Sequence, residues 1–167
     1  LLDCEKPIIC RLNGDAIGLG ATMALFCDII IASETARIGD LHVNVGLVAG
    51  DGGAIIWPQL IGYPRAKEFL MTGKIIDGRE AAELGLINHA VPPEELDART
   101  EEIVRWLDSG ATMAVRLTKA AVNVGLKQLA HGMMDASIAY ETLTNTMPDH
   151  QEGLAAFRER RKPKFGG

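Results

Sequence analysis

Residues 12–58 read LNGDAIGLGATMALFCDIIIASETARIGDLHVNVGLVAGDGGAIIWP and contain a glycine-rich turn that runs into an apolar segment. Gly14, Gly18 and Gly20 allow a tight turn, and the apolar residues 19–27 that follow predict a helix. The first N–H groups of a helix have no partner within the helix, so they can receive an anion. The turn therefore predicts an oxyanion site made by backbone N–H groups.

The same stretch contains a histidine and a carboxylate that can work as a pair. His42 and Asp51 lie nine positions apart (51 − 42 = 9), and Asp51 comes just before two glycines. A histidine titrates near neutral pH, and a carboxylate can orient its ring. We therefore predict that His42 is an acid–base group with Asp51 as its partner. The structural alternatives are a hydrogen-bonded histidine and, for Asp51, a helix cap.

Composition excludes several classes of function. The 167 residues carry a formal net charge of −5, which gives no basic field for nucleic acid. The most hydrophobic window is too short to cross a bilayer, and the N-terminus does not resemble a signal peptide, so we expect a cytoplasmic protein with no membrane partner. Three cysteines without metal-ligand spacing are expected to be reduced thiols, and no metal site is expected.

The chain divides into a mixed part, residues 1–92, and a helical part, residues 93–167. Prolines at 92 and 93 mark the change. The apolar stripes of the helical part and the shortage of strands before it predict an oligomer. Strands are expected at residues 7–12, 28–32, 36–38, 86–88 and 90–91, and helices at 19–27, from 52–53 through 60, 62–70, 77–85, 93–107, 112–126 and 131–144.

Several blocks in this order resemble the crotonase superfamily, the enoyl-CoA hydratase/isomerase group. They are KPIICRLNGDAIGLGATMALFCDIIIAS, ARIGD, GLVAGDGG, IWPQLIGYPRAKEFLMTG, AAELGLINHAV and EGLAAFRERRKPKF. The resemblance implies an α/β fold, the C-terminal portion of a spiral of ββα units, followed by a helical trimerisation region. It implies acyl-CoA thioesters as substrates, with coenzyme A as part of the substrate and no separate cofactor, and a homotrimer or hexamer.

The resemblance also implies that an enolate or related oxyanion is held by two backbone N–H groups. The second donor matches Leu19, in the middle of the glycine turn, while Gly18 and Gly20 allow the carbonyl to approach. The first donor belongs to a segment that family members carry upstream of Leu1. We therefore expect the chain to contain only the second donor.

The chain departs from a typical hydratase at two positions. The glutamate expected four residues after Gly18 is Thr22, and the glutamate of the FGxPE-type block is His42. The pattern H-x3-G-x-V-x-GDG with a following WP pair resembles the β-diketone hydrolases of the superfamily, which cleave a carbon–carbon bond with a His/Asp dyad. That dyad would be His42 and Asp51.

Other residues have two interpretations each. Asp15 beside the turn is a turn residue or a second carboxylate facing substrate. Thr22 is a packing residue or lines the pocket. Phe157 and Lys162, together with Arg161, match the C-terminal segment that lies near the CoA adenine and phosphates in the family. The basic residues at the C-terminus also fit a solvated helix end whose cations complement the helix dipole.

Three functions therefore stay open. The first is a crotonase-family enzyme that acts on an acyl-CoA thioester through an oxyanion intermediate, as a lyase or isomerase in which His and Asp replace the usual glutamates. The second is a hydrolase of β-diketones that does not need coenzyme A. The third is a catalytically silent module that keeps only its ligand-binding and oligomer-forming surfaces.

Overall fold

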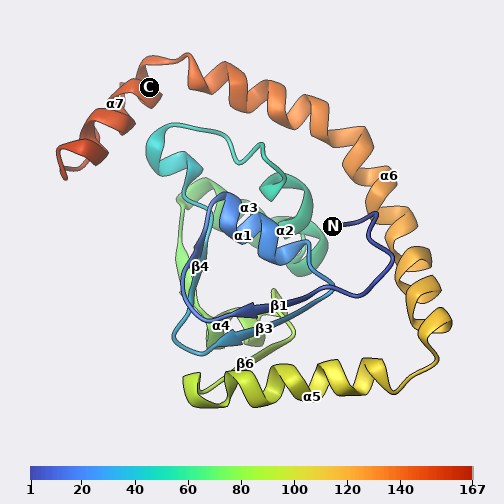
Figure 1. Ribbon diagram of the computed structural model, residues 1–167. Helices are drawn as coiled ribbons and strands as arrows, with labels where there is room; N and C mark the ends of the chain where they lie inside the picture. The colour runs from blue at the N-terminus through green and yellow to red at the C-terminus, as the bar shows by residue number, and fades with distance from the viewer. Residues whose placement is uncertain (167) are drawn as a thin grey trace.

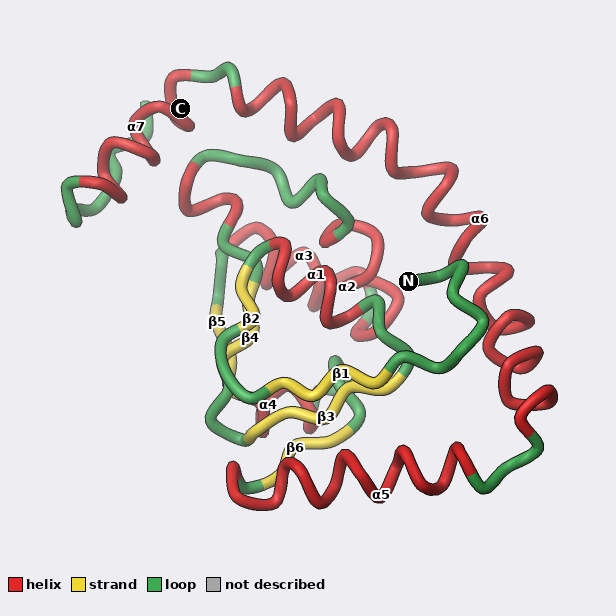
Figure 2. The backbone as a smooth tube through the Cα atoms, viewed as in Figure 1, coloured by secondary structure: helices red, strands yellow, loops and turns green. Residues whose placement is uncertain are grey.

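The strands of the protein form two three-stranded sheets in a computed structural model that describes residues 1–166. The first sheet has the order β1-β3-β6 with all strands parallel. In the second, β2 is parallel to β4, and β5 is antiparallel to β4. The two sheets stand at a large angle to each other (Figure 2). The strands are Ile9–Leu12 (β1), Ala16–Ile17 (β2), Ile29–Ser33 (β3), Arg37–Gly39 (β4), Ile75–Asp77 (β5) and His89–Val91 (β6).

The order of the elements explains why there are two sheets. In the first unit, β1 joins one sheet, β2 joins the other, and α1 leads back to the first sheet. β3 and β4 repeat this division, but α2 and α3 then lead to β5 in the second sheet, and α4 leads back to β6 in the first. The all-apolar run in β3 is central in its sheet, as expected for a strand that is buried on both faces. Successive units therefore wind as a spiral.

Three helices fill the corner between the sheets, and three longer ones form an arc around the mixed part (Figure 1). Trp57 of α2 is fully buried and packs against Phe69 of α3, with ring centroids 5.6 Å apart. Trp57 is thus a core residue. The helices are Leu19–Leu25 (α1), Gly53–Ile61 (α2), Tyr63–Thr72 (α3), Gly78–Glu83 (α4), Leu96–Asp108 (α5), Thr112–Asn145 (α6) and Pro148–Arg158 (α7), with 3-10 turns at His42–Val45 (η1) and Pro93–Glu95 (η2).

Helix α6 contacts the rest of the chain along a narrow stripe. Its buried residues Asn123, Ala130 and Ser137 recur every seven positions, so they lie on one face. The other faces carry exposed apolar side chains, among them Leu117, which is 61% exposed. None of the helices described is both long and apolar enough to cross a membrane.

The sequence predicted most of the helices and strands, but it placed some of their ends wrongly. The helices expected at 112–126 and 131–144 are one helix, because residues 127–130 are good helix formers and neither nearby glycine breaks it. Residues 86–88 are not a strand: Leu86 and Ile87 enter the core, and the side chain of Asn88 accepts a hydrogen bond from Ile30 N at 2.8 Å. The short strand β5 was not predicted. The three cysteines are free, as expected.

Candidate active site

The glycine turn places the start of α1 beside the second sheet. Gly18 has a positive φ of 58°, which favours glycine, and its N–H donates to the carbonyl of Gly39 in β4 at 2.9 Å. The first backbone bond of α1 runs from Thr22 N to Gly18 O at 3.0 Å. Leu19 is therefore the first helical residue, where an N–H has no acceptor within the helix. Its side chain is 57% exposed, so the backbone group is what it offers to a ligand.

His42 lies directly against this turn. It begins the 3-10 turn η1 after the end of β4. A Cβ atom added to Gly18 would lie 3.5 Å from Cε1 of His42, so backbone and imidazole are in near contact. The structure therefore brings together the glycine turn and His42, which the sequence predicted as an oxyanion site and an acid–base group.

A cavity of about 410 Å³ joins the turn to the C-terminus of the chain. Gly18 and His42 line it from the mixed part, and Phe157 and Arg161 line it from the end of α7 and the segment after it. Phe157 is 77% exposed, so its ring is free to pack on a ligand. Lys162 is exposed and is not among the residues that line this cavity.

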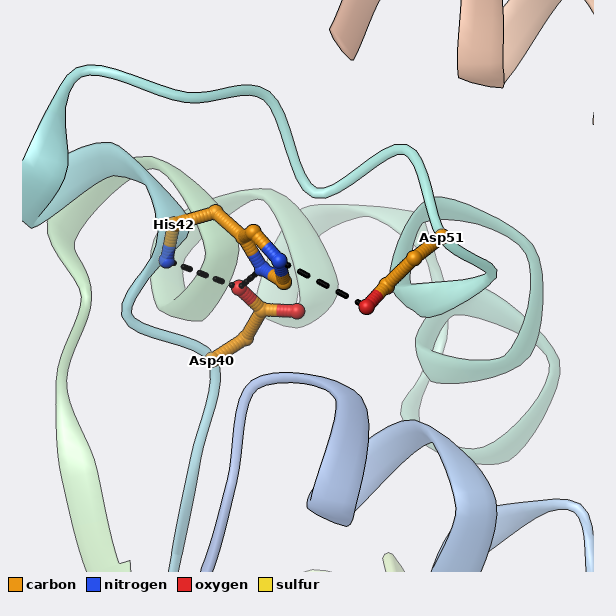
Figure 3. Close-up of side chains that lie close together, drawn as sticks. All are labelled: Asp40, His42 and Asp51. Atoms are coloured by element: carbon orange, nitrogen blue, oxygen red, sulfur yellow. Dashed lines mark hydrogen bonds and ion pairs between the residues drawn. The ribbon is translucent and has the colours of Figure 1, made fainter. Parts of the chain in front are cut away.

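Asp40 holds one side of the imidazole. Its Oδ1 atom lies 2.6 Å from His42 Nδ1 and accepts from the backbone N of His42 at 3.2 Å (Figure 3). The Asp40 side chain is 0% exposed. An ionised carboxylate can only accept, so Nδ1 carries the proton and Nε2 is left to act on a substrate.

Helix α2 begins next to the same carboxylate. A Cβ atom on Gly53, the first residue of α2, would lie 2.5 Å from Oδ2 of Asp40, so glycine is required for this approach. Oδ2 is buried and has no hydrogen-bond partner within residues 1–166. The positive pole of α2 favours the negative charge of Asp40 there.

Asp51 faces the other nitrogen of the ring. Its Oδ2 lies 3.5 Å from His42 Nε2, which is longer than an ordinary hydrogen bond (Figure 3). Its Oδ1 accepts from the Thr22 hydroxyl at 3.2 Å, so α1 positions the carboxylate. Asp51 was expected to fix the tautomer of His42, but Asp40 makes the Nδ1 contact. Asp40 makes this contact because it precedes His42 by only two residues, so the chain holds its carboxylate close to the ring.

The carboxylates around His42 raise its pKa. The hydrogen bond with Asp40 is the main cause, burial of the ring opposes it, and the charges of Asp40, Asp51 and Glu141 add to the increase. Asp40 and Asp51 contact opposite nitrogens, so the ring lies between them. This arrangement suits a hydrogen-bonded chain better than three ligands around one metal ion.

Asp15, which the sequence offered as a second carboxylate, lies elsewhere. It forms an ion pair with Arg37, with Arg37 Nε donating at 3.0 Å, and this pair lowers the pKa of the Asp15 carboxyl. Asp15 is not brought to the group around His42. His150 is buried, with Nδ1 2.8 Å from the carbonyl of Val45, because α7 packs on η1.

Sequence reasoning missed Asp40, although a signal was present. The residue precedes His42 by two positions in the block IGDLH, and a buried carboxylate near a histidine is a common orienting pair. It also missed Glu141, which lies ninety residues after Asp51 and is brought near it only by the course of α6 (141 − 51 = 90). Arg161, which was matched to the C-terminal segment, is held by Glu152 through Nη1 at 2.5 Å and Nη2 at 2.9 Å.

Comparisons with known proteins identify the family. The family model for "Enoyl-CoA hydratase/isomerase" matches residues 1–167. A crotonyl-CoA hydratase of Syntrophomonas wolfei is 38% identical over 161 residues, 96% of this chain and 62% of that protein. The human "Enoyl-CoA hydratase domain-containing protein 2, mitochondrial" is 40% identical over 166 residues, 96% of this chain and 56% of that protein. The chain thus spans about three-fifths of the length of these curated relatives.

Solved structures agree with the fold. An enoyl-CoA hydratase from Mycobacterium avium subsp. paratuberculosis superposes with a TM-score of 0.92 at 27% identity, covering 98% of this chain and 66% of that one. A carnitinyl-CoA hydratase from Mycobacterium avium gives a TM-score of 0.90 at 29% identity, covering 96% and 63%. The crotonase-like fold expected from the sequence is confirmed, and the chain belongs to the enoyl-CoA hydratase/isomerase family.

Proposed function

We propose that this chain carries the acid–base residues of an enzyme that binds an acyl-CoA thioester and stabilises an enolate. The single observation that carries the proposal is the contact of the Gly18 turn with the imidazole of His42 at the edge of one cavity. An oxyanion donor and a base within one ligand's reach can remove a proton next to a thioester carbonyl. Family membership supports the substrate class.

In the proposed reaction the N–H of Leu19 donates to the thioester oxygen. Nε2 of His42 takes a proton from the carbon next to the carbonyl, and the electron pair of the C–H bond moves to form the enolate. The Asp40 carboxylate stabilises the imidazolium that results. His42 then returns the proton to a carbon of the acyl group. His42 thus takes the acid–base role that two glutamates have in a typical hydratase.

A carbon–carbon hydrolysis is the second candidate. The observation that favours it is the set of side chains in the site, because a histidine between two carboxylates can activate water as a base. The product of bond cleavage in a β-diketone is also an enolate, so the Leu19 N–H would have the same task. The substrate would then need no coenzyme A.

A ligand screen separates these candidates. The protein is heated with CoA, crotonyl-CoA, acetoacetyl-CoA or a cyclic β-diketone, and turnover of each is measured by absorbance. A ligand at 100 times its Kd stabilises the folded state by about 2.7 kcal/mol. A rise in Tm with the thioesters and not with the diketone, together with turnover of a thioester, supports our proposal. A rise with the diketone and its turnover favours hydrolysis, and a rise in Tm without any turnover favours a silent module.

The oxyanion role of Leu19 has a matched pair of variants. Leu19→Pro removes the N–H at a helix position where proline is tolerated, and Leu19→Ala keeps it. Losing one such donor costs about 2.7–4 kcal/mol of transition-state stabilisation, so we expect turnover to fall in the proline variant alone. A folded Leu19→Pro protein with the turnover of Leu19→Ala would contradict the role.

We also propose that the chain assembles as a trimer or a multiple of it. The support is the set of apolar side chains that α6 exposes, which one subunit leaves in water. Sedimentation velocity at micromolar concentration measures the mass directly. A monodisperse monomer would contradict this proposal. Apart from Ile138, which lines a cavity beside Asp51, the exposed apolar residues of α6 and its C-terminal flank are Met113, Leu117, Val122, Val124, Tyr140, Leu143 and Met147.

A further inference from the structure

His42 and Asp51 line two separate cavities. His42 lines the cavity that holds the glycine turn, whereas Asp51 lines a second cavity of about 390 Å³ on the side of α6. The two side chains meet where His42 Nε2 and Asp51 Oδ2 lie 3.5 Å apart. A ligand in the first cavity would cover His42, whose side chain is only 13% exposed. The second cavity stays open to water on the other side of Asp51.

Glu141 of α6 is the charged residue that faces Asp51 across this second cavity. It lines the cavity with Ile138, Thr142 and Asn145. The approach is close, because a Cβ atom added to Gly50 would lie 2.9 Å from Oε2 of Glu141. The carboxylate of Glu141 thus lies next to Gly50, the residue that precedes Asp51.

Neither carboxylate is neutralised by a cation. Within residues 1–166, no lysine or arginine forms an ion pair with Asp51 or Glu141. By contrast, ion pairs hold Asp15 and Glu152 at the surface. His42 is the charged partner of Asp51 in this region, so a proton that reaches the Asp51 carboxylate is not excluded by a neighbouring lysine or arginine.

The Asp40 side of His42 cannot do this. Asp40 is 0% exposed, and its second oxygen is enclosed beside Gly53. A proton that moved to Asp40 would have no route to water. Asp51 is 19% exposed, so its carboxylate can exchange a proton with water.

We propose that His42, Asp51 and Glu141 form a proton relay from the covered cavity to solvent, with Glu141 as its outer residue. The proton on His42 Nε2 moves to Oδ2 of Asp51: the N–H bond breaks, the O–H bond forms and the ring becomes neutral. Asp51 then gives the proton to water in the second cavity, and the Glu141 carboxylate accepts it and exchanges it with solvent. The same steps in reverse protonate His42 again. The proposal rests on the acid–base role of His42 proposed above.

The charges that face His42 agree with this direction of transfer. Asp40 lies before η1, Asp51 in the loop before α2 and Glu141 on α6, and all three raise the pKa of the ring. Only the last two lead toward water. Losing Glu141 should therefore change both the pKa of His42 and the rate at which its proton exchanges.

The test measures exchange of the His42 imidazole N–H with water by ¹⁵N NMR, without any substrate. Glu141→Gln removes the outer acceptor, and Asp135→Asn removes one charge from an exposed position of the same helix as a matched control. We expect about tenfold slower exchange in Glu141→Gln, which corresponds to about 1.4 kcal/mol in the barrier, and no change in the control. Asp51→Asn should slow exchange at least as much.

The exchange rates of the Glu141 variants distinguish a proton relay from an effect of charge alone. Slower exchange in Glu141→Gln that Glu141→Asp restores, and that a small carboxylate buffer rescues, supports the relay. A lower pKa of His42 with unchanged exchange would show that Glu141 acts only through its charge, and would overturn it. If Glu141→Gln fails to fold, Glu141→Asp and Asp51→Asn still decide. The NMR measurement needs no turnover. If the protein has no activity on acyl-CoA, the proposed function is refuted, but the exchange rates of the variants still test the relay.

Discussion

The two sides of His42 are built in opposite ways. On the β4 side, Asp40 is buried, lies 2.6 Å from Nδ1 and is packed against the first residue of α2. On the α6 side, Asp51 is partly exposed, lies 3.5 Å from Nε2 and borders a cavity. The first side fixes the ring and its tautomer, and the second leaves a nitrogen free for chemistry.

The difference follows from where each carboxylate comes in the chain. Asp40 is two residues before His42, so the end of β4 and the start of η1 set its position together with the ring. Asp51 belongs to the loop between η1 and α2, which contains Gly46, Gly50 and Gly52. Loops with glycine adapt more readily than strand ends. A rigid partner and an adaptable partner therefore flank one histidine.

The largest expected effect comes from removing the ring that both sides share. Because a positioned acid–base group contributes about 10²- to 10⁴-fold, His42→Ala should lower kcat on the thioester substrate by that factor. Circular dichroism and Tm should show that the variant is folded. Turnover within a few-fold of the wild type would mean that neither side of His42 takes part in catalysis.

Asp40→Asn tests the rigid side. The amide oxygen of the asparagine can still accept from Nδ1, but its NH2 group replaces the second carboxylate oxygen, which is buried without a hydrogen-bond partner among residues 1–166. An unmet buried hydrogen-bonding group costs about 1–3 kcal/mol. We expect the free energy of unfolding in urea to fall by that amount, with a lower kcat from the wrong tautomer. An unchanged free energy of unfolding would show that the Asp40–His42 contact does not stabilise the fold.

Asp51→Asn tests the adaptable side. Its contact is long and partly exposed, and such pairs contribute about 0–1 kcal/mol, so we expect the free energy of unfolding to change by less than in Asp40→Asn. Turnover should fall more than stability does. If Asp51→Asn destabilised the protein as much as Asp40→Asn, the contrast between the two sides would be wrong.

Sequence reasoning reached the fold and the turn because both are local. The glycines at 14, 18 and 20 and the apolar run after them predict the turn and α1 without any long-range information. The order of blocks along the chain then indicates the family. The structure confirms that Gly18 and His42 share one cavity.

The rest depends on distances that sequence does not carry. Spacing suggested Asp51 as the orienting partner, but only coordinates show that Asp40 reaches Nδ1 and Asp51 reaches Nε2. Glu141 comes from a helix whose course around the mixed part no local pattern predicts (Figure 1). Ion pairing on the surface likewise removed Asp15 from the site.

The smallest expected effect is on the pH dependence of stability. The pKa of His42 is raised in the folded protein, mainly by the hydrogen bond with Asp40, so the protonated ring stabilises the fold. This contribution is fully present below the unfolded histidine pKa of about 6.5 and is lost as the pH rises through the raised folded value. The difference in unfolding free energy between wild type and His42→Gln should therefore be largest in mild acid.

The two sides should contribute unequally to that difference. Asp40→Asn removes the main cause of the raised pKa, so urea titrations between mild acid and mild base should show most of the pH dependence lost. Asp51→Asn removes only a smaller contribution and should keep most of it. ¹⁵N NMR titration of the ring measures the same order directly, because the pKa of His42 should fall further in Asp40→Asn. Equal losses in the two variants would mean that both carboxylates hold the charged ring equally, which is incompatible with one rigid and one adaptable side.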